Sequence, residues 1–280
     1  MSNEHKNSTI ELHIDIAAEH IAQKINPLEL LAQQTSLSKQ KLKDAMAKGA
    51  VWLSTSGASK SAKPIRRKNA KLKAGNQLSL YYNPHVLAQQ VDNPTLVADE
   101  GDYSVWNKPY GVWSQSSKWG DHCSIGRLVE QHFEFKRSSF VVHRLDRAAN
   151  GLILIAHNKK TSQLLSDLFA KRKVEKVYQA TVTGKFDKPQ TIELPIDDKK
   201  AISHVSLIDY DSSKNQSRLE VKIETGRKHQ IRKHLASIGF PIIGDRLYGQ
   251  AQAEDINLQL TAYQLAFDCP LSAQSKTYQL

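Results

Sequence analysis

Cysteine is scarce in this sequence. Of its 280 residues only two are cysteine, Cys123 and Cys269, which stand far apart and belong to no Cys-x-x-Cys pair. Two such residues are too few for a disulfide scaffold, and without a Cys-x-x-Cys pair they do not suggest a zinc site. We therefore expect two free thiols in a reducing compartment and no metal centre.

Long hydrophobic runs are also missing. No stretch approaches the roughly 20 apolar residues that cross a membrane, and the first residues, MSNEHKNSTIELHIDI, contain no apolar signal core. We therefore expect a soluble, cytoplasmic protein without a membrane partner. No separate pattern marks a protein interface, so we expect a monomer with no obligate protein partner.

Acidic residues are outnumbered by basic ones. The chain has 28 Asp and Glu against 39 Lys and Arg, for a net charge of +11. Such a surplus attracts polyanions, which means RNA, DNA or an acidic membrane surface. The alternative is an enzyme that happens to be basic. The hydrophobic share of 40% is ordinary for a globular protein, and 280 residues suit two domains.

The first part of the chain reads as a small basic α+β domain over residues 10–83. A helical pattern extends from Pro27 to Gly49, with Ser38 as an N-cap of its second helix and Gly49 at that helix's end. Strands are predicted at 50–53 and 77–82. Between them a loop at 54–64 leads into a run at 60–73 that is rich in Lys and Arg and has no acid.

Residues 84–94 read as a linker, because Asn-Pro pairs bracket them. Residues 95–280 then read as a larger domain built on a mixed, mostly antiparallel sheet, so the predicted fold class is α+β. Its predicted elements are strands at 152–156, 174–183 and 218–223 and helices at 160–171 and 228–238.

One carboxylate stands out in the segment VVHRLDRAANGLILIA. Asp146 lies between Arg144 and Arg147, and neighbouring positive charge favours the ionised carboxylate that a nucleophile or base requires. The pair Asn150-Gly151 predicts a turn before the following strand. The alternative is a structural ion pair on a loop, which these residues alone do not exclude.

Two further segments carry candidate groups. Lys176 and Tyr178 alternate along a predicted strand, so they share a face, where the tyrosine can stack on a base or fill a core. Basic residues also crowd the start of the predicted helix at 228–238: Arg227, Lys228, His229, Arg232, Lys233 and His234. Positive charge there opposes the helix dipole, which favours an anion ligand over a merely solvated face. The histidine spacing does not suit a metal site.

Five segments occur in the order and spacing of the RluA-type pseudouridine synthases, over residues 95–271. They are NKPYG at 107–111, HRLDR at 143–147, KVYQATVTG at 176–184, TGRKHQIRKHLASIGFPIIGDRLYG at 225–249 and LTAYQLAFDCP at 260–270. The resemblance implies a mixed-sheet catalytic domain with an RNA cleft. It also implies isomerisation of uridine to pseudouridine by base flipping, without a metal or an organic cofactor.

The resemblance also implies roles for single residues. Asp146 resembles the nucleophilic aspartate, Tyr178 the tyrosine that packs on the target base, and Arg232 the arginine that pairs with the aspartate. Arg144 resembles a residue that inserts into the RNA as the uridine leaves its stack. At the basic helix start, we expect Arg227 and His229 to contact RNA as well.

The sequence departs from the family pattern at three places. Ala148-Ala149-Asn150 stand where an acidic residue, Thr and Ser are usual, and Ser114-Gln115-Ser116 replace His-Pro-Gly. Thr261 replaces a histidine. These changes leave the aspartate, tyrosine and arginine in place. We therefore expect an active enzyme whose rate or target preference differs.

The first domain resembles, less strongly, the RNA-binding domain named for ribosomal protein S-four. The matching stretches are LSKQKLKDAMAKGAVWL at 37–53 and KLKAGNQLSLYY at 71–82. The phosphate contacts that this implies are Lys39, Lys41, Lys43, Arg66, Arg67 and Lys68. A solvated lysine-rich surface is the alternative. Such a domain favours large-subunit ribosomal RNA as the substrate over transfer RNA.

Two other functions compete with this reading. A non-catalytic RNA-binding or ribosome-assembly factor could retain the synthase fold, and the altered residues 148–150 favour it. A hydrolase of sugar phosphates or nucleotides that uses Asp146 is disfavoured, because the sequence contains no cluster of metal ligands.

Overall fold

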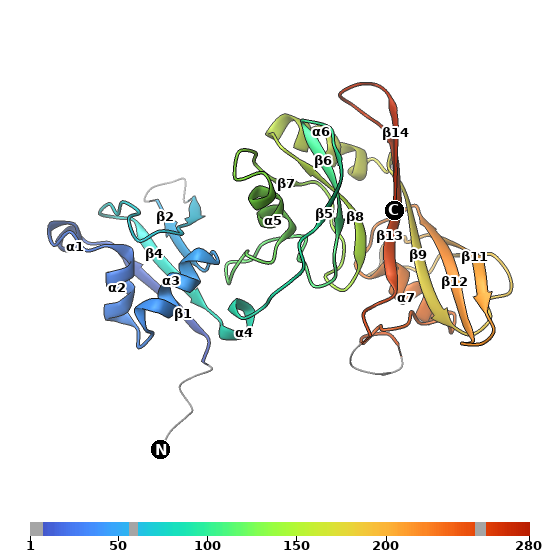
Figure 1. The fold of residues 1–280 in the computed structure, drawn as a ribbon, viewed down its shortest axis with the longest axis horizontal. Helices are drawn as coiled ribbons and strands as arrows, with labels where there is room; N and C mark the ends of the chain where they lie inside the picture. Colours follow the sequence, from blue (N-terminus) through green and yellow to red (C-terminus); the bar gives the residue numbers. More distant parts are fainter. Residues whose placement is uncertain (1–7, 56–60, 250–255) are drawn as a thin grey trace, which may run out of the picture. The chain divides into compact units, whose positions relative to one another are not determined.

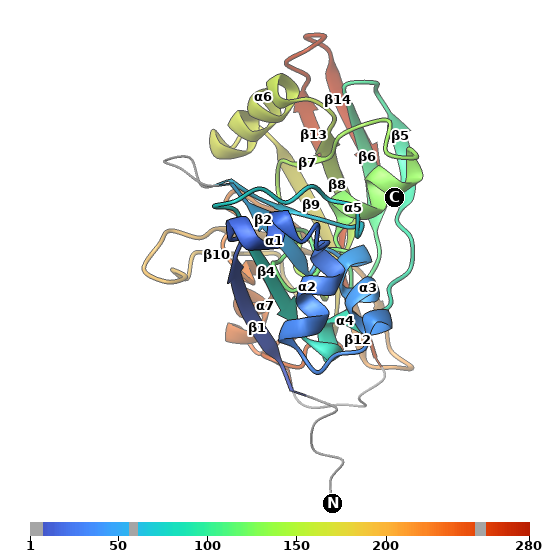
Figure 2. The same ribbon diagram turned by 90° about the vertical axis from the view of Figure 1, so that its left-hand side faces the viewer.

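The computed structural model describes residues 8–55, 61–249 and 256–280. These residues form two compact units, which Figures 1 and 2 show from two directions. The first comprises residues up to Gln90 together with Ser116–Ser124, and the second comprises Val91–Gln115 and Ile125–Leu280. Part of the predicted loop at 54–64, and Lys60 of the basic run, lie outside the described residues.

The first unit is a four-stranded antiparallel sheet with helices on one face (Figure 2). Its elements are β1 (Ile10–Asp15), α1 (Ala18–Ala22), α2 (Pro27–Gln34), α3 (Lys39–Ala47), β2 (Val51–Ser54), β3 (Ala62–Pro64), β4 (Gln77–Tyr82) and α4 (Pro84–Leu87). Leu31, Leu42 and Leu80 are among the residues that fill the core between helices and sheet. The strand order is β1-β4-β2-β3.

Local sequence signals set the ends of the helix pair. Ser38 caps α3 by accepting a hydrogen bond from the backbone N–H of Lys41 at 3.3 Å, as predicted. Gly49 follows the helix with a φ of +80°, the left-handed conformation that favours glycine after a helix. The helix predictions from Pro27 to Gly49 are therefore confirmed.

The segment Ser116–Ser124 comes from the middle of the chain, yet it packs within the first unit. Trp119 lies edge-on to Tyr81, with 5.7 Å between the ring centroids, and Lys118 forms a 2.8 Å ion pair with Glu11. No local pattern predicted this contact, because its partners are distant in the sequence.

The second unit is a large mixed sheet with the strand order β10-β11-β12-β9-β13-β8-β6-β5. Its elements are β5 (Thr95–Asp99), β6 (Tyr103–Lys108), α5 (Ile125–His132), β7 (Phe140–Val141), β8 (Asn150–Ala156), α6 (Lys159–Ala170), β9 (Glu175–Thr183), β10 (Gln190–Ile192), β11 (Ser203–Asp211), β12 (Gln216–Ile223), α7 (Gln230–Ser237), β13 (Leu260–Asp268) and β14 (Ser275–Gln279). Of the strand pairs described, β8 with β13 is parallel and the others are antiparallel. The predicted fold class, α+β with a mostly antiparallel sheet, is confirmed.

The parallel contact between β8 and β13 corrects one prediction. Asn150-Gly151 do not form a turn; they begin β8, beside Thr261 and Ala262 of β13. Gly151 has a φ of +116°, and a Cβ there would lie 2.4 Å from the carbonyl oxygen of Ala262. Glycine is needed at this position because another backbone comes so close.

The helix α7 lies against the sheet near β12 and β13 (Figure 1). Ile231 and Leu235 anchor it in a core shared with Ala180 of β9 and Val221 of β12. The start of α7 therefore faces the beginning of β8. Among the described residues, no helix combines the length and apolar character that crossing a lipid bilayer requires. Both cysteines are buried, and neither forms a disulfide bond.

Candidate functional site

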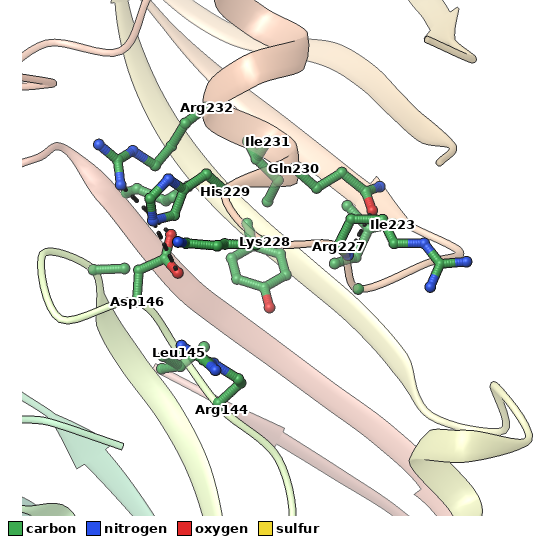
Figure 3. Close-up of a pocket in the computed structure, with 14 residues that line it drawn as sticks. Arg144, Leu145, Asp146, Ile223, Arg227, Lys228, His229, Gln230, Ile231 and Arg232 are labelled. Atoms are coloured by element: carbon green, nitrogen blue, oxygen red, sulfur yellow. Dashed lines mark hydrogen bonds and ion pairs between the residues drawn. The ribbon is translucent and has the colours of Figure 1, made fainter. Parts of the chain in front are cut away.

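Asp146, Tyr178 and Arg232 meet in one pocket of the second unit, which we call the aspartate pocket. Asp146 comes from the loop before β8, Tyr178 from β9 and Arg232 from α7. The pocket has a volume of about 290 Å³, and Figure 3 shows its lining. The lining residues are Arg144, Leu145, Asp146, Ala149, Tyr178, Ile223, Gly226, Arg227, Lys228, His229, Gln230, Ile231, Arg232 and Leu260.

Two side chains at the start of α7 point toward the Asp146 carboxylate (Figure 3). Arg232 Nη1 lies 3.7 Å from Asp146 Oδ2, and His229 Nε2 lies 3.8 Å from Oδ1. These distances allow Coulombic attraction but are too long for good hydrogen bonds. The carboxylate therefore sits beside positive charge while its oxygens remain open to a ligand.

The two arginines that flank Asp146 in the chain have other surroundings. Arg147 donates to the carbonyl oxygen of Gly111 at 3.2 Å and lies over the Trp113 ring. Arg144 is exposed at the pocket wall. The ion-pair partners of Asp146, Arg232 and His229, come from the start of α7 instead.

Arg232 is held by a second carboxylate that the sequence did not identify. Its Nε and Nη2 donate to the Asp245 oxygens at 2.8 and 2.7 Å, and both side chains are buried. Burial would raise the pKa of Asp245, but hydrogen bonds from Arg232 and from two backbone N–H groups outweigh it and lower that pKa. This bidentate pair fixes the guanidinium plane and leaves Nη1 directed at Asp146.

His229 occupies a strained backbone position at the helix start. Its φ of 55° and ψ of 28° are left-handed, which is uncommon for a residue other than glycine. The imidazole Nδ1 lies 2.9 Å from the Tyr248 hydroxyl. Burial lowers the pKa of His229 and Arg232 adds to this, although the Asp146 charge acts in the opposite direction. The side chain is therefore held in place as a predominantly neutral group near pH 7.

Tyr178 contributes the wall on which a planar ring could pack. It is half-buried and packs against two apolar clusters of the sheet, which fixes its position. Burial, and then the negative charge of Asp146, raise the pKa of Tyr178 well above its usual range. The phenol therefore stays protonated at neutral pH. It can stack or donate a hydrogen bond, but it is a poor base.

Buried polar groups hold the backbone on both sides of Asp146. Ser114 Oγ accepts from the Leu145 N–H at 2.9 Å and donates to the Leu145 carbonyl oxygen at 2.7 Å. Lys108, which is fully buried, donates to the carbonyl oxygens of Ala149 at 2.7 Å, Val112 at 3.1 Å and Pro109 at 3.0 Å. Neither role was predicted from the sequence. A lysine at the end of an apolar strand was the available signal for the second.

The other predicted RNA contacts fall into two groups. In the second unit, Arg227 lines the aspartate pocket and points away from Asp146 (Figure 3). In the first unit, Lys39, Lys41, Lys43, Arg67 and Lys68 are exposed. Arg66 differs, because its guanidinium donates to the Ala47 carbonyl oxygen and pairs with Asp121.

Within the described part of the chain, no group of three or more His, Cys, Asp or Glu side chains is placed to hold a metal ion. The basic helix start accordingly presents cationic and neutral donors around one carboxylate. Such an arrangement suits an anionic ligand with an electrophilic centre near Asp146.

Comparison with known proteins bears on this geometry. The model of the RNA pseudouridylate synthase family matches residues 102–237. An uncharacterized RNA pseudouridine synthase of Zymomonas mobilis is 33% identical over 185 residues, which cover 59% of this chain and 84% of that protein. An uncharacterized RNA pseudouridine synthase of Chloroflexus aurantiacus is 40% identical over 123 residues, but these cover only 39% of this chain and 38% of that protein.

A ribosomal large subunit pseudouridine synthase D of Borreliella burgdorferi is 30% identical over 199 residues, covering 62% of this chain and 60% of that protein. Among solved structures, human RNA pseudouridylate synthase domain containing 1 superposes with a TM-score of 0.57. It is 20% identical and covers 69% of this chain and 84% of that one. At this identity the likeness concerns the fold alone.

Proposed function

Because the chain belongs to the RNA pseudouridylate synthase family, a family of isomerases, we propose that it converts uridine to pseudouridine in structured RNA with Asp146 as the nucleophile. The observation that carries the assignment of residues is the aspartate pocket. It brings a carboxylate, an arginine 3.7 Å away and a half-buried tyrosine together from three separate elements.

The reaction moves uracil from one attachment to another. The bond between C1′ of the ribose and N1 of the base breaks, and a bond between C1′ and C5 forms; C5 loses a proton and N1 gains one. C1′ becomes electron-poor as the base departs, so the Asp146 carboxylate can attack it or stabilise it. Arg232 places positive charge 3.7 Å from this carboxylate.

The target base has to leave its stack to reach Asp146. Extrusion costs a few kcal/mol, and stacking on an aromatic ring returns about 1–3 kcal/mol. Tyr178 is placed for this packing role, and its raised pKa makes it a donor rather than the base that takes the C5 proton. Arg144, exposed at the rim, is suited to filling the gap that the flipped uridine leaves.

We further propose large-subunit ribosomal RNA as the substrate, with transfer RNA as the alternative. The net charge of +11 supports a polyanionic partner. The first unit, which we propose to be an S-four-like RNA-binding domain, would add phosphate contacts through exposed Lys39, Lys43, Arg67 and Lys68. Arg66 is left out of this set because it is paired with Asp121. The name of the Borreliella relative favours the ribosomal substrate.

The test is to substitute Asp146 by Asn and by Ala and to map pseudouridines in cellular RNA. We expect a discrete site to lose its pseudouridine in both variants and in a deletion strain. Asp92→Asn, which alters an exposed aspartate outside the aspartate pocket, is the matched control and should restore that site to the deletion strain. If every pseudouridine persists in the deletion strain, the isomerase proposal fails and a non-catalytic RNA-binding factor becomes the better hypothesis.

A further inference from the structure

A second cavity adjoins the aspartate pocket and shares Arg144, Tyr178 and Arg227 with it. We call it the side groove. Its volume is about 450 Å³, and it extends from Tyr178 toward the end of α6, where Arg172 and Lys176 line it. Neither Lys176 nor Arg172 was assigned a function from the sequence.

The side groove carries an excess of positive charge. Four of its lining residues are cationic, namely Arg144, Arg172, Lys176 and Arg227. Its one acidic residue, Glu224, is engaged elsewhere, because its carboxylate lies 2.9 Å from His204 Nε2. Little internal negative charge is thus available to balance these cations.

Lys176 raises the free-energy cost of this excess positive charge. Its side chain is partly buried, and within the described residues it forms neither a hydrogen bond nor an ion pair. Burial, and then the nearby Arg172 charge, lower the pKa of Lys176. A partly buried cation without a counter-ion is unfavourable in the free protein. An anion in the side groove would remove that cost.

Arg172 gives a second, independent reason to expect an anion in the side groove. It ends α6 in the left-handed conformation, with a φ of 56°, and its N–H donates to the Phe169 carbonyl oxygen at 3.2 Å. Glycine is the usual residue at such a helix end. An arginine there holds a strained backbone conformation, and its side chain lines the side groove.

The floor of the side groove is uncharged. His143 stacks on Phe169 with 4.2 Å between ring centroids, and its Nε2 accepts the N–H of Leu154 at 3.0 Å. A histidine that accepts a backbone N–H at Nε2 is neutral on that nitrogen. The cations therefore stand at the walls of a groove whose base is aromatic.

We propose that the side groove binds a backbone phosphate of the RNA strand that carries the target uridine, with Lys176 and Arg172 as its ligands. This rests on the proposed function, since the aspartate pocket would hold the flipped base. Tyr178 lines both cavities, so a strand whose base packs on that ring has its adjoining phosphates within reach of the groove. Phosphate is the anion that every nucleotide of such a strand supplies.

The experiment measures binding of a large-subunit ribosomal RNA transcript over a series of salt concentrations. Lys176→Met and Arg172→Gln should each weaken binding several-fold and lower the slope of log Kd against log salt by about 0.7–1, the amount expected for one lost phosphate contact. Lys188→Met is the matched control, because Lys188 is an exposed lysine that lines none of the cavities described. Its slope should equal that of the unmodified chain.

Turnover on the same transcript separates binding from a merely structural role. Both groove variants should raise KM more than they lower kcat, since the contact is made before and during the reaction. If Lys176→Met fails to fold, Arg172→Gln decides, because that side chain is exposed. Slopes equal to that of Lys188→Met would overturn the proposal even if pseudouridine forms. If the two groove variants have lowered slopes but even the unmodified chain forms no pseudouridine, the phosphate site is retained and the isomerase proposal is rejected.

Discussion

Thr261 donates a 2.8 Å hydrogen bond from Oγ1 to Oδ1 of Asn150. The two residues are register partners where β13 runs parallel to β8. Both positions were interpreted from the sequence as departures from the family pattern, and in the structure their side chains bond to one another.

A double-mutant cycle at Asn150 and Thr261 tests this relationship. Thr261→Val and Asn150→Ala should each reduce the free energy of unfolding by about 1 kcal/mol, the usual net value of a hydrogen bond. Because each change removes the same contact, the double variant should lose less than the sum. Urea unfolding of the four proteins measures this. Strict additivity would mean that the hydrogen bond contributes no coupling free energy between the two positions.

Removing the Asp245 carboxylate should disable Arg232. Asp245→Asn keeps the shape but leaves a buried guanidinium without its bidentate partner, which should cost about 3–5 kcal/mol of folding free energy. Misplacement of the group beside Asp146 should lower kcat by about 100-fold. Asp268→Asn, at an exposed site, is the control in unfolding and turnover assays. Normal kcat in a folded Asp245→Asn protein would contradict the role given to this pair.

Ser114 should position Asp146 through the backbone of Leu145. Ser114→Ala leaves a buried N–H and a buried carbonyl oxygen unpaired, at about 1–3 kcal/mol each. We expect kcat to fall while the affinity for RNA changes little. Ser114→Thr keeps the hydroxyl and should recover part of kcat, and Ser116→Ala, at an exposed serine, should match the unmodified protein. An unchanged kcat for Ser114→Ala in folded protein would refute the positioning role.

His143 should make the protein sensitive to acid. Burial, with Lys176 nearby, lowers the pKa of His143 from 6.5 to about 3. Between these two pH values the His143 imidazole therefore binds a proton in the unfolded chain but not in the folded chain. The stability that comes from the neutral folded imidazole is complete above pH 6.5 and is lost as the pH falls toward 3.

The measurement is the free energy of unfolding at about pH 7.5 and about pH 5. The free energy of unfolding that is lost between these two pH values should be smaller in His143→Gln than in the unmodified protein, by on the order of 1 kcal/mol. The glutamine amide oxygen can still accept the Leu154 N–H. His85→Gln changes an exposed histidine and should lose as much stability as the unmodified protein. If all three proteins lose the same free energy of unfolding between the two pH values, His143 is not the cause of the acid sensitivity.

The sequence by itself determined the elements whose signals are local. The helix caps at Ser38 and Gly49, the alternation along β12 and the apolar period of α7 depend on neighbours a few residues away, and all four appear in the structure. The roles of Asp146, Tyr178 and Arg232 were predicted differently, from the resemblance of several segments to one family, and they stay predictions.

Only the tertiary structure decided which groups surround those side chains. Asp146 lies between two arginines in the chain, yet the guanidinium 3.7 Å from its carboxylate belongs to Arg232 of α7. Asn150-Gly151 was expected to turn, yet β13 approaches and draws it into a strand. Asp245 and Ser114 act on residues 13 and 31 positions away, respectively. Such partners are fixed by the packing of sheet and helix, which no local pattern records.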